Sequence, residues 1–383
     1  MAQFDSENLT DAGTDDDVSK ALKELPKDLD DTYERALLKL SGLNREKAVV
    51  CLTWIAFAPN PLTVAELVAA VGLGLSNEPP PLTDEEDSKP KISEARLQVL
   101  LLPPGLVVVD EKVSFSHFSV KEYLISDRIK SSEARDFALN EQAAHIQIAQ
   151  ACLRYHLYIS KEKAQNEITD PILREFRLWD YAGEFGLGHV ESVARDQWTP
   201  SLCGRLQDVF EHRGVAFRNL VWLQRDWLLA SSDPDNFKFP SPLYYTIYMG
   251  YGQLFGLLLE SSPSLVNALG GRYGTALNLA CRAGMLDAME ILLDAGADPY
   301  LGCWRCKCAL HASFLTFGSN KRAKEKLLGL PGMLERCAEL GYVRLSETHF
   351  TLLLFGGPCH DVPTDLASRL LGYVEDEDAE DED

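Results

Sequence analysis

The sequence predicts a mainly α-helical protein that comprises a winged-helix-like domain with a short β-hairpin, a helical middle region and a C-terminal α-solenoid. Three observations predict this fold class. Apolar residues recur at helical spacing along most of the chain, two β-rich runs meet at a charged turn, and one helix-pair pattern recurs in the last third. A chain of 383 residues is also too long for one ordinary core, so we expect two or three domains.

The net charge of −21 lies partly in acidic runs near both ends, "TDDD" and "EDEDAEDED". Such runs repel themselves and predict disorder. The predicted segments are a disordered acidic leader at 1–17, the winged-helix-like domain at 18–130, a helical connector at 131–235, about three repeats at 236–330, a C-terminal helical extension at 331–374 and a disordered acidic tail at 375–383.

Charge and composition also exclude several partners. An acidic chain is a poor ligand for nucleic-acid phosphates or anionic lipid, so we expect no nucleic-acid and no membrane partner. The start lacks the pattern of a signal peptide, and no apolar run is long enough to span a bilayer. Nine cysteines, an odd number, fit reduced thiols better than a disulfide framework. These features predict a cytoplasmic protein.

Helical patterns open the predicted winged-helix-like domain. Apolar side chains at 29–40 recur at spacings of three and four. The run 45–59 is apolar nearly all round between Ala48 and Ala58, which predicts a buried helix. Thr63 and Glu66 have the spacing of a capping box, so a third helix begins there. The domain continues with a proline-rich loop at 77–91 and a short helix at roughly 93–102.

The stretch "VSFSHFSVKEYLIS" at 113–126 reads as a strand that turns into a helix. Alternation places His117 on the same face as Val113, and Ser119 with Glu122 predicts a capping box for a helix that runs to 129. No G-x-S-x-G elbow supplies a nucleophile for His117. We therefore interpret His117 as a strand-end residue whose ring packs or bonds locally.

Three motifs in this domain carry a resemblance. "ALKELPKDLDDTYERALLKL", "LTWIAFAPNPLTVAELVAAV" and "VSFSHFSVKEYLISDRI" resemble the winged-helix segment of large fungal NACHT-ankyrin proteins, which is of the type found in glycosylphosphatidylinositol deacylase sequences. They cover about a third of the chain in the family's order. In that family an NTPase module precedes the segment, but only the acidic leader stands before residue 18. The chain resembles the rear part of the family's architecture.

Catalytic motifs are missing from the sequence. A G-x-x-x-x-G-K-[ST] phosphate loop, a G-x-S-x-G elbow and an H-E-x-x-H zinc motif do not occur. We therefore expect no enzyme activity and no cofactor.

The middle region is expected to contain helices at 132–160, 172–193, 201–212 and 219–230. "YAGEFGLGH" is similar to a stretch that follows the winged helix in the fungal family, with Gly186 where tryptophan is common. We expect Gly186 to loosen its helix. Trp222 and Trp227 are interpreted as core aromatics.

The C-terminal third contains the helix-pair pattern. "GTALNLACRAGMLDAMEILLDAGADP" at 274–299 resembles the ankyrin consensus, with Thr275 opening the first helix and Gly284 ending it. The same frame places Ser241 and Gly250 in a copy 34 residues earlier. A degenerate third copy begins at "CALHASFLTFG". The resemblance implies a stack that binds other proteins through its turns and its concave helix face.

Four residues are predicted to be exposed on that binding surface by their position in the repeat. They are Arg272, Tyr273, Asn278 and Arg282. The alternative, that they are ordinary surface residues, stays open.

"CWRCKCALH" contains a weak candidate metal site. Cys303, Cys306, Cys308 and His311 have C-x-x-C-x-C-x-x-H spacing, and thiolates with one imidazole can bind zinc. However, Cys308 and His311 stand where the repeat places its threonine and histidine. The structural interpretation is therefore preferred, and we expect no metal.

These expectations favour a non-catalytic interaction or regulatory protein. The repeats would bind other proteins, the winged helix would act as a packing and transmission module, and full-length NACHT relatives are one expected class of partner. Two alternatives are a winged-helix nucleic-acid-binding protein and a fragment of a larger receptor NTPase. The apolar stretch "ISEARLQVLLL" argues against the first, because a recognition helix needs polar side chains.

Overall fold

The computed structural model describes residues 29–40, 42–75, 102–103, 105–162, 178–211, 214–223, 239–303, 306–314, 321–330, 333, 343–346 and 349–352. The chain forms two compact units, Met1–Arg225 and Asp226–Asp383. The second unit thus begins before residue 236, where the repeats were predicted to start. Within the described residues, no helix combines the length and hydrophobicity that a membrane crossing needs.

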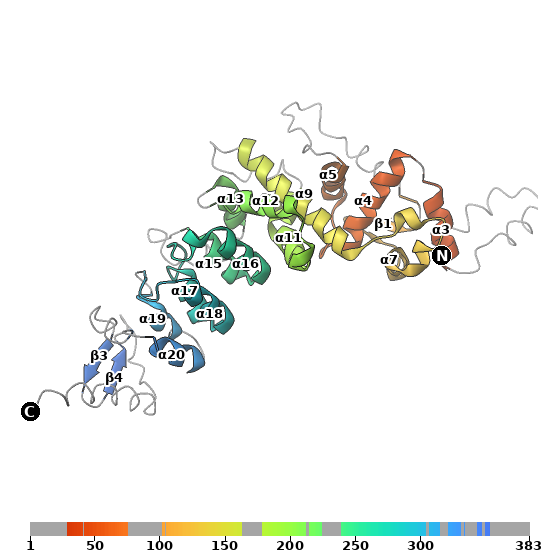
Figure 1. Cartoon of the computed structure of the whole chain (residues 1–383). Helices are drawn as coiled ribbons and strands as arrows, with labels where there is room; N and C mark the ends of the chain where they lie inside the picture. Colours follow the sequence, from red (N-terminus) through yellow and green to blue (C-terminus); the bar gives the residue numbers. More distant parts are fainter. Residues whose placement is uncertain are drawn as a thin grey trace, which may run out of the picture. The chain divides into compact units, whose positions relative to one another are not determined.

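The described part of the first unit begins with three helices, a hairpin and two further short helices (Figure 1). In chain order these are α3 (Leu29–Leu38), α4 (Leu43–Phe57), α5 (Val64–Leu75), β1 (Val107–Val109), β2 (Val113–Phe115), α7 (Phe118–Ile125) and α8 (Asp127–Lys130). The helices predicted within 29–40 and 45–59 are confirmed as α3 and α4. Their apolar stripes lie in one core that also includes side chains of α9 and α11.

The start of α5 has the predicted capping box. The Thr63 backbone N–H donates to the Glu66 carboxylate at 2.7 Å, and the Glu66 N–H donates to Thr63 Oγ1 at 3.3 Å. The hairpin is hydrogen-bonded to the residue before Thr63, because the Val113 N–H donates to the Leu62 carbonyl at 2.8 Å. Within the hairpin the strands are antiparallel, with Val109 opposite Val113.

The helix after the hairpin begins differently from the prediction. His117 is the residue that caps α7, and its Nδ1 accepts from the Ser119 N–H at 3.3 Å. The predicted Ser119–Glu122 capping box is therefore wrong, since the helix already includes Ser119. The prediction that His117 bonds locally is confirmed, because its Nδ1 also lies 2.7 Å from Ser119 Oγ.

The predicted continuous helix to residue 129 is also wrong. Ser126 has an extended backbone, with φ −76° and ψ 164°, and separates α7 from α8. Its hydroxyl donates back to the Tyr123 carbonyl at 2.8 Å. A serine that bonds to its own preceding turn competes with the helical hydrogen bonds, which explains the break.

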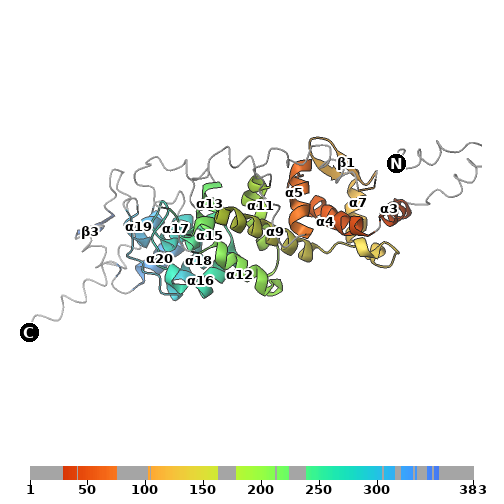
Figure 2. The ribbon, with the colours of Figure 1, turned by 90° about the horizontal axis from the view of Figure 1, so that it is seen from above.

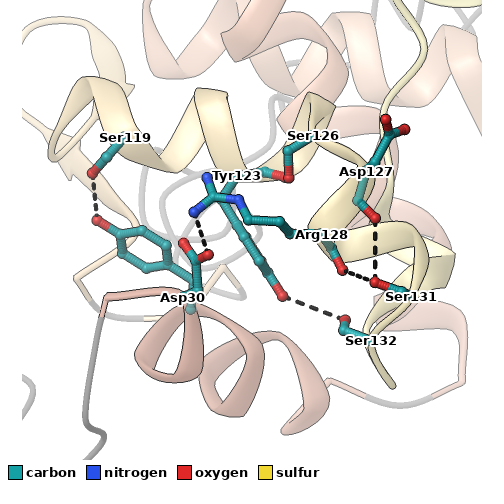
Figure 3. Close-up of polar contacts among 9 residues, drawn as sticks. Asp30, Ser119, Tyr123, Ser126, Asp127, Arg128, Ser131 and Ser132 are labelled. Atoms are coloured by element: carbon teal, nitrogen blue, oxygen red, sulfur yellow. Dashed lines mark hydrogen bonds and ion pairs between the residues drawn. The ribbon is translucent and has the colours of Figure 1, made fainter.

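Polar contacts hold α3 against this segment (Figure 3). The Tyr33 hydroxyl lies 2.8 Å from Ser119 Oγ, and Asp30 forms an ion pair with Arg128. Next to them, the buried Tyr123 directs its hydroxyl toward Ser132 Oγ at 3.4 Å. Tyr33 and Tyr123 are both buried, so these bonds satisfy hydroxyls at the edge of an apolar core.

The rest of the first unit is helical. It contains η2 (Arg135–Phe137), α9 (Glu141–Glu162), α11 (Trp179–Glu191), η3 (Arg195–Gln197), α12 (Pro200–Val209) and α13 (Val215–Leu223). The helix predicted at 132–160 begins only at Glu141, because Asn140 Oδ1 accepts from the Ala143 N–H at 2.9 Å. The segment before it turns once in η2 and buries Phe137.

Gly186 does not loosen α11, which is continuous through it. A Cβ built on Gly186 would lie 2.9 Å from the Cβ of Cys152 in α9. The glycine therefore allows α11 to pack directly against the backbone of α9, and the expected weakening of the helix is wrong.

Among its described residues, the second unit contains three helix pairs, which follow one another side by side (Figures 1 and 2). α15 packs on α17, and α17 packs on α19. The helices are α15 (Pro242–Met249), α16 (Gly252–Ser261), α17 (Ala276–Ala283), α18 (Leu286–Asp294), α19 (Ala309–Phe314) and α20 (Lys321–Leu328), with η5 (Pro263–Leu265) between the first two pairs.

The first helix of each pair begins with the same capping bond. Ser241 Oγ accepts from the Tyr244 N–H at 3.2 Å, and Thr275 Oγ1 accepts from the Asn278 N–H at 3.1 Å. In the third pair, Cys308 Sγ accepts from the His311 N–H at 3.4 Å. The prediction that Thr275 opens a helix is thus confirmed. The same capping position recurs in both neighbouring pairs.

Two strands contradict the predicted helical extension at 331–374. β3 (Val343–Ser346) pairs antiparallel with β4 (His349–Leu352), with Val343 opposite Leu352 and Leu345 opposite Phe350. The sequence "VRLSETHFTL" alternates apolar and polar residues, which is a strand pattern. That period of two was overlooked.

Several predictions lie outside the described residues. They concern the leader at 1–17, the loop at 77–91, almost all of the helix at 93–102, Trp227 and the acidic tail at 375–383.

Candidate protein-binding surface

Three of the predicted surface residues lie together in the second unit, although each is partly buried and not fully exposed as predicted. Arg272 and Tyr273 belong to the loop before α17, and Arg282 lies in the last turn of that helix. The Arg282 guanidinium carbon lies 5.0 Å from the centre of the Tyr273 ring, and that of Arg272 lies 5.9 Å from it. Both distances are those of cation–π contacts, so two positive charges lie near the aromatic ring.

Asn278 is not exposed, so that part of the prediction is wrong. Its side chain is 0% exposed, and its Nδ2 donates to the carbonyls of Tyr273 at 3.0 Å and Leu301 at 2.9 Å. The amide thus connects the loops before two successive helix pairs.

Beside Tyr273 the surface is hollowed, with a volume of about 340 Å³. We call this the Tyr–Arg hollow. Among the large apolar lining residues, Tyr248 and Met285 are exposed, at 48% and 40%. The full lining consists of Ile247, Tyr248, Tyr273, Leu279, Arg282, Ala283 and Met285.

Sequence reasoning missed Tyr248 and Met285, although a signal for the first was present. Tyr248 lies 34 residues before Arg282, so the repeat frame that selected Arg282 also selects Tyr248 in the preceding copy. Met285 follows the helix-ending Gly284, a position that the frame interprets only as a turn.

Hydrogen bonds fix the loops that carry this surface. The Gly270 N–H donates to the Gly274 carbonyl at 2.7 Å, which closes the loop before α17. Gly271 has φ +72°, and a Cβ there would come within 2.5 Å of the Tyr244 ring, so only glycine fits. Asn267 bonds the next loop, accepting from the Asp298 N–H at 2.8 Å and donating to the Gly296 carbonyl at 3.2 Å.

The Tyr–Arg hollow combines side-chain types that are common at protein interfaces. Tyrosine and arginine are enriched among residues that dominate binding free energy at interfaces. Methionine fits its flexible side chain to irregular apolar surfaces. The described lining holds one cation and no carboxylate, so the hollow favours an apolar group accompanied by negative charge.

The cysteine-rich segment does not form the weakly predicted zinc site. Among the described residues, no group of three or more His, Cys, Asp or Glu side chains could hold a metal ion. Cys308 Sγ caps α19, and His311 Nδ1 accepts from the Lys307 N–H at 3.1 Å. Cys306 Sγ donates to the Cys308 carbonyl at 3.3 Å, so these groups satisfy one another locally.

A second polar cluster lies inside the first unit. His145 Nδ1 lies 2.7 Å from His189 Nδ1, and His189 Nε2 lies 2.8 Å from the Tyr181 hydroxyl. Burial, with a smaller contribution from the neighbouring His145, lowers the pKa of His189 to about 3. The pKa of His145 is also lowered by burial. Both rings are thus neutral near pH 7, and the hydrogen bond between them requires that one of the two Nδ1 atoms carries a proton.

Comparison with known proteins bears on the first unit most directly. Residues 33–140 match the family described as "GPI inositol-deacylase, winged helix domain". This supports the winged-helix part of the predicted fold, together with the three helices and the two-stranded hairpin within that range.

A curated protein is similar over more of the chain. "Azaphilone pigments biosynthesis cluster protein L" of Monascus ruber is 29% identical over 299 residues, which is 72% of this chain and 61% of the relative. The chain thus spans about three fifths of that relative's length. No solved structure matches the chain.

Proposed function

We propose that this protein is a non-catalytic interaction protein that binds other proteins through its second unit. The observation that carries the proposal is the Tyr–Arg hollow, where Tyr248, Tyr273, Arg282 and Met285 present aromatic, cationic and flexible apolar groups on one surface. Surfaces of this composition are typical of binding sites.

The helix pairs of this unit are further proposed to be an ankyrin-type α-solenoid. Capping residues at 241, 275 and 308 are separated by 34 and 33 residues, and Gly250 and Gly284 both end their helices in a left-handed conformation. The asparagine-mediated bonds between successive loops support the same architecture. In such stacks each pair contacts its neighbours, which leaves one face continuous for binding.

The winged-helix domain is proposed to be a packing and transmission module, as in the fungal NACHT-ankyrin proteins that the sequence resembles. Related full-length NACHT proteins are the class of partner that this resemblance favours. We place the protein in the cytoplasm and assign it no cofactor. Hydrolysis of ATP or of an ester by the purified chain would contradict the non-catalytic proposal.

The test is affinity capture with matched surface variants. Tyr248→Ala and Arg282→Glu change the hollow, whereas Ile291→Ala removes an apolar side chain of α18 that is 46% exposed and does not line the hollow. Proteins captured from an extract of the source organism are quantified by mass spectrometry for the wild type and each variant. Circular dichroism verifies that every variant is folded.

The expected result is a protein that both hollow variants lose and Ile291→Ala retains. Loss of a central tyrosine or arginine at an interface commonly costs 2 kcal/mol or more, which corresponds to a decrease in affinity of about thirtyfold. Capture that is the same for the wild type and both hollow variants would contradict the proposal.

A further inference from the structure

Cys303 and Cys306 face each other across a tight turn in the loop before α19. The Cys303 N–H donates to the Cys306 carbonyl at 2.6 Å. The neighbouring residues Gly302 and Lys307 also lie close together, because a Cβ on Gly302 would come within 2.0 Å of the Lys307 carbonyl oxygen. Opposed residues joined by such bonds have Cα atoms about 5.5 Å apart and side chains on the same face. Disulfides span Cα separations of about 4.4–6.8 Å.

The two thiols differ in accessibility. Cys303 is half-buried, and its Sγ contacts the Arg272 carbonyl at 3.5 Å. Cys306 is fully buried and donates to the Cys308 carbonyl. Burial raises the pKa of Cys306 well above its ordinary value, and the nearby thiols of Cys303, Cys308 and Cys281 raise it further.

We propose that Cys303 and Cys306 are a redox-active dithiol that oxidised glutathione, a small-molecule disulfide, converts into an intramolecular disulfide. The Cys303 thiolate attacks one sulfur of oxidised glutathione, the glutathione S–S bond breaks, and one glutathione thiolate leaves and takes up a proton. The Cys306 thiol then loses its proton and attacks the Cys303 sulfur of the mixed disulfide. The second glutathione leaves as a thiol. Two protein thiols are oxidised and one glutathione disulfide is reduced.

The order of the two steps follows from the difference in exposure. Cys303 is the sulfur that a solution disulfide can reach, and Cys306 is the neighbour held opposite it. The new bond draws Cys306 away from the Cys308 carbonyl and Cys303 away from the Arg272 carbonyl. Cys308 caps α19, and Arg272 adjoins the Tyr–Arg hollow, so both contacts have structural consequences. The proposal does not depend on what the hollow binds.

Tryptic mapping of the full chain tests the pairing. The protein is equilibrated in mixtures of reduced and oxidised glutathione, blocked with N-ethylmaleimide, and digested without reductant. Because Arg282, Arg305 and Lys307 separate the candidates, each cysteine falls on its own peptide. Cys281 lies on 273–282, Cys303 on 283–305, Cys306 on 306–307 and Cys308 on 308–321.

The expected product is peptide 283–305 linked to 306–307, which increases with the proportion of oxidised glutathione and disappears after treatment with a dithiol reductant. Linkage of 283–305 to 273–282 or 308–321 would overturn the assignment. So would a Cys303 that is blocked by N-ethylmaleimide at every ratio, or one that stops at the mixed disulfide.

Two serine variants and a control complete the test. Cys303→Ser should abolish the linked species, and Cys306→Ser should leave Cys303 as a stable mixed disulfide with glutathione. Cys203→Ser, on α12 of the other unit, should leave the linkage unchanged. A Cys306→Ser protein in which Cys303 still forms an intramolecular disulfide would contradict the proposal.

Discussion

Gly186 shows how one missing side chain determines the distance between two helices. The Cβ it lacks would lie 2.9 Å from the Cβ of Cys152, a separation that real Cβ atoms do not adopt. Gly188, two residues further along the same helix, has no atom within 4 Å of a Cβ built there. The two glycines therefore have opposite consequences for stability.

We expect Gly186→Ala to lower the free energy of unfolding by about 1–3 kcal/mol, because the added methyl group forces α11 away from α9. Gly188→Ala should raise it by up to about 1 kcal/mol through helix propensity alone. Urea unfolding monitored by tryptophan fluorescence measures both. Equal effects of the two substitutions would show that helix propensity, and not packing against Cys152, determines the change in the free energy of unfolding.

Asn278 illustrates why the residues of a binding surface are only partly predictable. Its position in the repeat indicated exposure, but the loops at Tyr273 and Leu301 cover it and take its two amide donors. Those loops are set by contacts between successive helix pairs, which no local pattern contains. Arg272, Tyr273 and Arg282 depend less on such contacts, and the structure brings those three together.

Elements begin where a side chain satisfies the first free backbone N–H groups, and this rule accounts for most predicted helix starts. The capping residues Thr63 and Thr275 were predicted because their residue type and place before a helical pattern are the usual ones. His117 was missed as a cap because histidine is an uncommon one. The strands β3 and β4 were missed because repeats before them favoured a helical interpretation.

Thr275 provides a test of the repeated cap. Thr275→Ala removes the acceptor for the Asn278 N–H and should lower the free energy of unfolding by about 0.5–2 kcal/mol. Thr275→Ser keeps a hydroxyl and should remain close to the wild type. Thermal unfolding followed by circular dichroism measures the difference. If serine and alanine destabilise the protein equally, then packing of the threonine methyl group, and not the capping bond, is the contribution that matters.

At the scale of the whole molecule, the sequence predicted the helical class and the winged-helix part, because both depend on local periodicity and caps. The division into two compact units depends instead on which helices share a core. Side chains of α9 and α11 belong to the same apolar core as the winged-helix segment. The predicted boundary after residue 130 therefore cuts through one packed unit, which a reading by motif could not reveal.

That shared core contains three histidines whose pKa values are lowered by burial. The pKa of His156 falls to about 4 and that of His189 to about 3, and His145 is shifted in the same direction, with Glu141 opposing and Lys121 reinforcing the shift. The ordinary value is 6.5. Between the lowered pKa values and 6.5, the unfolded chain binds more protons than the folded chain. The contribution of these histidines to the free energy of unfolding is therefore greatest above about pH 6.5 and decreases as the pH falls.

We expect the free energy of unfolding to decrease between pH 7.5 and pH 5 by about 2 kcal/mol for each of His156 and His189, since one pH unit corresponds to about 1.4 kcal/mol per proton. Urea unfolding at the two pH values, monitored by fluorescence of the buried tryptophans, measures this decrease. His156→Leu removes one of the titrating groups and should make the decrease smaller by about the same amount. A stability that does not change over this range, or a decrease that His156→Leu leaves intact, would show that the buried rings do not control the response to acid.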